Sequence, residues 1–231
     1  MLAAFFAAET GREFRKKGDV MKGVLAIVVA CCLGLVGCAQ TVEEPVEVEE
    51  VAVVEWERVL PGLMNDTQKA QQELILTATN ALASEMMAEL MASLDESGAA
   101  GGIGACRDKA PTVAANVSET YGVGIGRTSN LLRNAANVAP AWAETYVADM
   151  VEDPTWVGGP DGELGALLPI RLKAECQMCH GPVETIDQEV MAAILEAYPD
   201  DQAVGYSDGD LRGWFWVEAL PGEEDMAEPE V

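Results

Sequence analysis

The spacing of apolar positions changes along the chain, and each spacing predicts a different element. Residues 65–97 carry leucine, alanine and methionine at helical intervals behind the capping candidates Asn65, Asp66 and Thr67. This pattern predicts a long amphipathic helix. A glycine-rich break, GAAGGIGA, follows it, and the chain beyond Pro111 again has a helical pattern. The first half of the folded region is therefore expected to be helical.

The second half mixes strand and helix patterns. YGVGIGRTS alternates Tyr121, Val123 and Ile125 with glycines, which predicts a strand that packs close to a flat group, because glycine lets a backbone approach. We expect helices after Pro140 and over TIDQEVMAAILEAY, strands over ALLPIRLKAE and DLRGWFWVEAL, and turns over EDPTWVGGPDGELG. These elements predict one α+β domain, in which a long N-terminal helix and further helices flank a small sheet.

The N-terminal region has the pattern of a secretory signal. A lysine precedes an apolar run from Val24 to Val36, which is short for a bilayer span and typical of a signal core. An unprocessed membrane helix is the alternative. Residues 1–20 look unlike the start of a signal, so Met21 is the expected initiator. We therefore exclude residues 1–37 from the fold.

The signal ends in LVGC, which resembles the lipobox of bacterial lipoproteins. The resemblance implies cleavage before Cys38 and attachment of acyl chains to that residue, which would anchor the protein stably in a membrane. Ala39 is compatible with transfer to an outer membrane. We therefore expect a lipoprotein on the periplasmic side of a bacterial membrane, with the outer membrane favoured over the inner one.

Charge narrows the possible partners. The chain has 14 basic and 39 acidic residues, and removal of residues 1–37 takes away five basic and three acidic ones, which leaves 9 against 36 and a formal charge of −27. Much of the acid lies in a tether, residues 38–64, and in a tail, residues 221–231. Such a surface repels nucleic acid and favours a basic protein partner.

The stretch AECQMCHGPV contains the candidate cofactor-binding residues. It brings together Cys176, Cys179 and His180, the only histidine of the chain. Two thiols one helical turn apart can bond to the two vinyl groups of haem, and the imidazole that follows is a good axial ligand for the iron. This attachment needs export, which the signal supplies. The motif predicts one covalent haem c.

A zinc site and a disulfide or dithiol are the alternatives to haem. A zinc site could use Cys106, Cys176, Cys179 and His180, but adjacent Cys179 and His180 point different ways and rarely share one tetrahedral ion. A disulfide or redox dithiol between Cys176 and Cys179 is compatible with an oxidising compartment. However, it leaves His180 unexplained.

The second axial ligand stays open on residue chemistry alone. With one histidine, bis-histidine ligation is excluded by counting. Methionine is the ordinary ligand of an electron carrier. Cys106 is the other candidate, because it is the thiol not used by lipid or haem, and Arg107 and Lys109 would favour its thiolate form. A small buried hydrophobe is the plainer interpretation of Cys106.

Five segments, CRDKAP, GRTS, LRNAANVAPAW, CQMCHG and YSDGDLRG, resemble a family of bacterial single-haem proteins that was long described as a domain of unknown function. The resemblance covers about residues 68–219. It implies a PAS-like c-type haem domain over residues 65–220, with thioethers at Cys176 and Cys179 and with His180 and Cys106 as axial ligands. Cys106 is then preferred over three methionines, which are Met150, Met178 and Met191.

Three arginines recur inside these segments: Arg127, Arg133 and Arg212. Haem carries two propionates, which guanidinium groups bind in a bidentate way. We therefore predict that these arginines contact the cofactor. A salt bridge to a protein carboxylate is the alternative for each of them.

The predicted function is that of a membrane-tethered c-type haem protein that passes or stores one electron and meets a separate redox partner. The alternative is a haem-based sensor of redox state or of a diatomic gas, which would signal through another protein. A peroxidase-like enzyme is disfavoured because there is no distal histidine. A zinc module is disfavoured because adjacent Cys179 and His180 rarely share one tetrahedral ion. No catalysis beyond electron transfer is expected.

Overall fold

The computed structural model describes residues 56–221. The predicted signal with Met21, the lipidation site Cys38, and most of the acidic tether and tail lie outside the described residues. None of the helices between residues 56 and 221 is long and apolar enough to span a membrane.

The long helix predicted behind Asn65 is α1 (Asp66–Gly104). It starts with a capping box: the Asn65 side chain accepts a hydrogen bond from the Gln68 backbone at 2.7 Å, and the Gln68 side chain accepts one from the Asn65 backbone at 3.1 Å. The predicted glycine-rich break appears at Gly98, whose φ of 63° interrupts the helical backbone. Within α1 only Gly98 leaves the helical conformation, and the helix resumes after it.

The helix continues into two further segments. A π-helix, η2 (Ala105–Lys109), follows α1 directly and leads into α2 (Ala110–Tyr121). Gly122 ends α2 with a φ of 65°, a left-handed conformation that glycine adopts without a Cβ clash. The predicted helix beyond Pro111 is therefore confirmed.

Five antiparallel strands form one sheet in the order β1-β3-β4-β5-β2. The strands are β1 (Glu57–Arg58), β2 (Val123–Thr128), β3 (Thr155–Gly158), β4 (Leu164–Arg171) and β5 (Leu211–Ala219). The predicted strands β2, β4 and β5 are confirmed, and the small sheet with flanking helices confirms the α+β class.

Two strands differ from expectation. The passage EDPTWVGGPDGELG holds β3 and the start of β4, so the prediction of turns alone is wrong there. Its turn residues are real, but they flank a four-residue strand that forms through long-range pairing, with Thr155 opposite Leu167. In addition, β1 lies in residues 56–64, which were assigned to the tether. The folded unit therefore begins earlier than residue 65.

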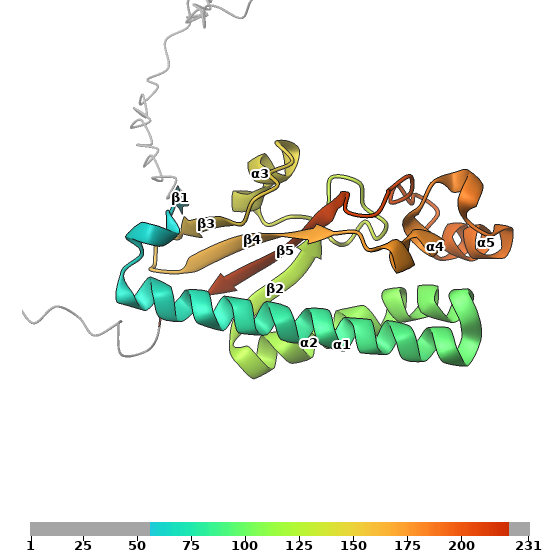
Figure 1. Ribbon diagram of the computed structural model, residues 1–231. Coiled ribbons are helices and arrows are strands. Elements are labelled where there is room, and N and C mark those ends of the chain that lie inside the picture. The colour runs from blue at the N-terminus through green and yellow to red at the C-terminus, as the bar shows by residue number, and fades with distance from the viewer. Residues whose placement is uncertain (1–55, 222–231) are drawn as a thin grey trace, which may run out of the picture. The chain divides into compact units, whose positions relative to one another are not determined.

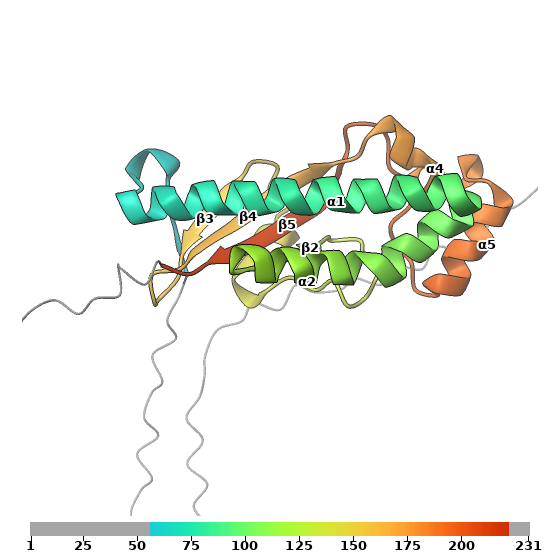
Figure 2. The ribbon, with the colours of Figure 1, turned by 90° about the horizontal axis from the view of Figure 1, so that it is seen from below.

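Helices cover both faces of the sheet (Figures 1 and 2). Helices α1 and α2 lie side by side on one face. Their core with the sheet includes Ile75, Leu82, Val117, Val123, Leu164 and Val217. The opposite face carries η3 (Ala141–Ala143) and α3 (Glu144–Ala148), the helical turns predicted after Pro140. The core on that face is built from Ala143, Val147, Leu167 and the fully buried Trp214.

The predicted close approach along β2 occurs at Gly126. A Cβ atom there would lie only 2.5 Å from the ring of Trp216 on the neighbouring strand β5. The flat group that the glycines accommodate is therefore this indole ring.

The motif region closes one end of the molecule (Figure 1). It comprises η4 (Ala174–Cys176), α4 (Gln177–His180), η5 (Val183–Thr185) and α5 (Gln188–Ala197). The predicted helix α5 is capped by Asp187, whose side chain accepts a hydrogen bond from the Glu189 backbone at 2.8 Å. Ile103 from the end of α1 packs in one cluster with Val190, Ile194 and Tyr198. This cluster joins the motif region to the long helix.

Candidate functional site

Both motif cysteines lie on one short helical turn. Cys176 ends η4, and Cys179 lies within α4, three residues later. Residues three apart share a helix face, and both side chains are half-buried free thiols. They are therefore available for bonds to the same group, and they do not form the disulfide considered as an alternative.

The imidazole of His180 is held in one tautomer. Its Nδ1 lies 2.7 Å from the carbonyl oxygen of Ala203. A carbonyl oxygen only accepts, so Nδ1 carries the hydrogen and Nε2 keeps its lone pair. Metal-binding histidines are commonly oriented through such a bond from the other ring nitrogen.

The electrostatics of the site also keep this ring neutral. Burial, together with the positive charges of Arg133 and Arg212, lowers the pKa of His180 to about 3. Protonation of Nε2 would therefore not compete with a metal for its lone pair near neutral pH.

Arg133 connects the motif to the loop that orients His180. Its Nε and Nη2 lie 3.0 and 3.1 Å from the two carboxylate oxygens of Asp201. Nη2 also donates to the carbonyl oxygens of Cys179 at 2.6 Å and Ala203 at 3.2 Å. Both side chains of the ion pair are nearly buried, with 10% and 2% exposed. The bonds seen for Arg133 thus go to protein groups, and its predicted propionate contact stays a prediction.

Tyr206 adds another polar group near His180. Its hydroxyl is buried and finds no hydrogen-bond partner among residues 56–221, although its backbone NH donates to the carbonyl oxygen of His180 at 2.9 Å. The Arg212 guanidinium lies over the Tyr206 ring, 5.3 Å from its centre. A buried hydroxyl without a partner is costly, so this atom is positioned for a ligand or a water molecule.

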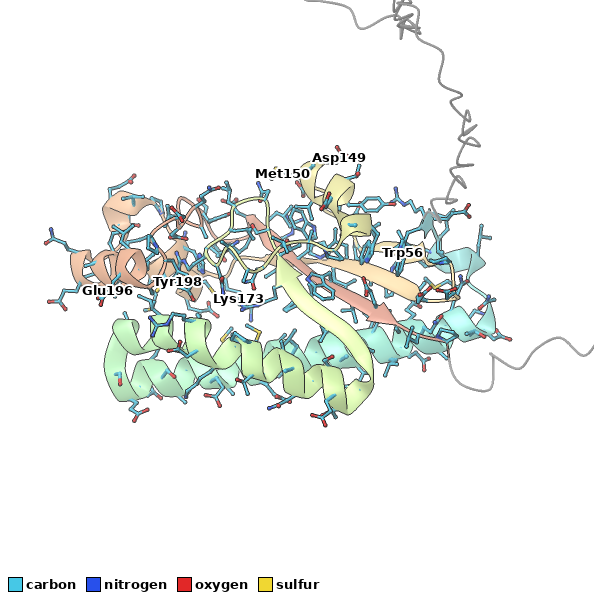
Figure 3. The ribbon with its side chains drawn as sticks, turned by 180° about the vertical axis from the view of Figure 1, so that it is seen from behind. Trp56, Asp149, Met150, Lys173, Glu196 and Tyr198 are labelled. Atoms are coloured by element: carbon cyan, nitrogen blue, oxygen red, sulfur yellow. The ribbon has the colours of Figure 1, made fainter. Side chains whose placement is uncertain are left out.

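Cys106 lies in the π-helix η2, half-buried, one turn after Ile103. Ile103 shares its cluster with Cys179 and Tyr198, and Figure 3 shows Tyr198 on the side of α5 that faces α1 and α2. Burial raises the pKa of Cys179, and the nearby Cys106 thiol raises it further. The segment that carries Cys106 therefore packs beside the motif, 70 residues away in sequence.

The cations near Cys106 have different surroundings. Arg107 pairs with Asp108 at 2.8 Å and Lys109 with Glu89 at 2.8 Å, all at the surface. By contrast, burial lowers the pKa of Arg127, and this lowering is opposed by the adjacent Cys106 and Tyr198 side chains. In the part of the chain that the structure describes, no hydrogen bond or ion pair engages the Arg127 guanidinium. The predicted propionate contact of Arg127 stays a prediction.

The alternative methionines are placed differently. Met150 is half exposed beside α3, and its sulfur accepts a hydrogen bond from Asn130 at 3.6 Å (Figure 3). Met178 is 49% exposed within the motif itself, whereas Met191 packs in the cluster that contains Cys179.

The zinc alternative can be compared with the same geometry. Between residues 56 and 221, no three histidine, cysteine, aspartate or glutamate side chains are gathered as ligands of a metal ion.

Sequence reasoning missed Asp201, Ala203 and Tyr206, which orient or adjoin His180. Tyr206 lies in YSDGDLRG, one of the five segments that resemble the haem family. For Ala203 no signal existed, because its contribution is a backbone carbonyl, which every residue carries.

Together these features define a small α+β domain that holds a single Cys-x-x-Cys-His turn at one end of its sheet. The chain belongs to the Tll0287-like family, whose family model matches residues 59–219. Among solved structures, the cyanobacterial heme-protein Tll0287 aligns with 19% identity and a TM-score of 0.48, over 68% of this chain and 97% of that one. No curated protein matches the chain.

Proposed function

We propose that this protein is an exported, lipid-anchored c-type haem protein that passes or stores one electron on the periplasmic side of a bacterial membrane. Support comes from its family, which shares its name with a heme-protein. The observation that carries the proposal is the state of His180 behind two free thiols: a neutral ring with Nδ1 bonded to Ala203 and Nε2 available. Bound haem supplies one-electron chemistry at its iron.

The residues present fit this cofactor. Cys176 and Cys179 would each add sulfur and hydrogen across one vinyl group, and His180 Nε2 would be the proximal ligand. Cys106 would be the second ligand in the PAS-like arrangement that the family resemblance implies. The unpartnered hydroxyl of Tyr206 and the guanidinium of Arg127 suit the two propionates, which need donors in so acidic a protein.

The remaining residues position the site and the partner. Asp201 and Arg133 hold the loop whose carbonyl orients His180. The formal charge of −27 after processing would attract a basic redox partner and speed its approach at low salt. We expect no catalysis beyond electron transfer.

Covalent attachment tests the proposal directly. Protein matured with its signal should keep haem through acid-acetone extraction, and its intact mass should include one porphyrin. The variant with Cys176→Ala and Cys179→Ala should lose both properties. The matched thiol control Cys106→Ala should keep covalent haem, while its Soret band shifts and its midpoint potential rises because an axial ligand is lost. Free extraction of haem from the native chain would refute covalent attachment.

The lipid anchor needs a separate test. Labelling of growing cells with a tagged fatty acid should mark the native protein and leave Cys38→Ser unlabelled. Equal labelling of both proteins would contradict an anchor at Cys38, with no effect on the haem proposal.

A haem-based sensor is the second candidate, because the predicted sixth ligand Cys106 lies in a π-helix shortly after the kink at Gly98. Short π-helices are rare and occur often at functional sites, and such a segment can release a ligand more easily than a continuous α-helix. Fast binding of carbon monoxide or nitric oxide to the reduced protein would favour sensing through a separate partner. Inertness towards both gases would favour electron transfer.

A further inference from the structure

Arg212, the second residue of β5, is held rigidly from several sides. Its Nη1 donates to the Ser129 hydroxyl oxygen at 2.9 Å and lies 3.3 Å from the carbonyl oxygen of Leu131. The Ser129 hydroxyl in turn donates to the Arg212 carbonyl oxygen at 2.8 Å. The guanidinium also lies over the Tyr206 ring. These contacts leave the charged group little freedom to move.

This fixed cation lies directly behind the imidazole of His180. Arg212 Nε is 3.3 Å from His180 Nδ1. That nitrogen already donates its hydrogen to Ala203 at 2.7 Å, so it has no lone pair for Arg212 and the contact is not a hydrogen bond. A full positive charge is therefore held against the back of the ring without a bond to offset it.

Arg212 also has no ion pair of its own among the described residues. The other arginine near His180, Arg133, forms an ion pair with Asp201 at 3.0 Å. Within residues 56–221, by contrast, no carboxylate lies at ion-pair distance from Arg212. A unit charge at this range in a half-buried site changes an equilibrium between two charge states about tenfold or more.

We propose that Arg212 raises the redox potential of the haem iron by acting as a fixed positive charge behind the proximal histidine. The inference rests on the proposed haem function. Loss of an electron adds positive charge on the iron side of the ring, and a cation behind the ring opposes that change. Arg212 is thus a positioning residue, and this role differs from its predicted propionate contact.

A pair of variants separates charge from hydrogen bonding. Arg212→Gln removes the charge and keeps an amide donor for Ser129, whereas Arg212→Lys keeps the charge. In the covalent holoprotein, Arg212→Gln should raise the ferric-to-ferrous ratio at a fixed ambient potential at least tenfold, which is a fall in midpoint of about 59 mV for a one-electron couple. Arg212→Lys should stay within about threefold of wild type. Lys69→Gln, which removes the same charge from an exposed position at the start of α1, should leave the ratio unchanged.

Several outcomes would overturn the inference. A tenfold shift in Arg212→Lys would show that geometry, not charge, is decisive, and this result is informative even if Arg212→Gln does not fold. An unchanged ratio in Arg212→Gln, or an equal shift in Lys69→Gln, would exclude a local charge effect. Wild-type protein without covalent haem would instead refute the proposed function, which the mass measurement detects before any potential is determined.

Discussion

The ion pair between Arg133 and Asp201 is expected to be a major stabilising contact of the site. Replacement of Arg133 by Met removes the cation and leaves the Asp201 carboxylate, 2% exposed, without its partner. Loss of one member of a buried pair costs about 3–5 kcal/mol of unfolding free energy. The carbonyl oxygens of Cys179 and Ala203 also lose a donor at 2.6 and 3.2 Å. For a domain of this size, the cost corresponds to a fall in Tm of roughly 6–20 °C.

The assay is denaturant unfolding followed by far-UV circular dichroism and by the haem absorption band. The matched control is Arg171→Met, which removes an arginine from an exposed pair with Glu152 at 2.9 Å, whose side chains are 44% and 69% exposed. Exposed pairs contribute at most about 1 kcal/mol. Addition of Asp201→Asn to Arg133→Met should recover part of the loss, because the unpaired buried charge is then gone.

The comparison with Arg171→Met and the comparison with the double variant test different parts of the reasoning. If Arg133→Met lost no more stability than Arg171→Met, the buried pair would not hold the site together. If the double variant were no more stable than Arg133→Met alone, the cost would come from the unsatisfied carbonyls or from packing, and the electrostatic reasoning would be refuted.

Two further predictions concern packing and pH. Gly126→Ala should lower the unfolding free energy by about 1–3 kcal/mol, because its Cβ would lie 2.5 Å from the Trp216 ring. Gly124→Ala should cost less, because its nearest contact is a Glu218 carboxylate oxygen at 3.3 Å and the Trp216 ring is 3.7 Å away. Equal losses in thermal unfolding would contradict this contact. The pH prediction uses the haem-free variant with Cys176→Ala and Cys179→Ala. The pKa of the buried His180 is about 3, against the usual 6.5, so between these pH values His180 takes up a proton only when the protein unfolds. The stability that the neutral ring contributes above pH 6.5 is therefore lost as the pH falls towards 3. At pH 4.5 the loss of unfolding free energy is about 2–3 kcal/mol. Addition of His180→Gln should remove that part of the acid sensitivity. If the pH profile were the same with and without His180→Gln, the ring would not be buried as a neutral group.

The sequence contained local information of two kinds. The helical spacing behind Asn65, the alternation around Ile125 and the cap at Asp187 predicted α1, β2 and α5, because each pattern acts through neighbours within a few residues. The Cys-x-x-Cys-His spacing likewise defined which side chains share one turn. The candidate haem-binding residues could therefore be recognised from the sequence alone.

Other features depend on contacts between distant segments. Strand β3 was hidden among turn residues because its four residues are stabilised by pairing with β4, not by their own propensity. Nothing local marked Arg127, rather than Arg107, as the cation beside Cys106, since nearby carboxylates neutralise Arg107 and Lys109.

The tertiary structure adds most to the sequence at His180. Its presence in the motif was evident from the sequence, but its tautomer depends on a backbone carbonyl 23 residues away and its electrostatic surroundings on Arg133 and Arg212. Residue identity determines which groups can bind a metal. Only the tertiary structure decides which of them are neutral, oriented and adjacent, because protonation and hydrogen bonding depend on the burial and charges that folding brings together.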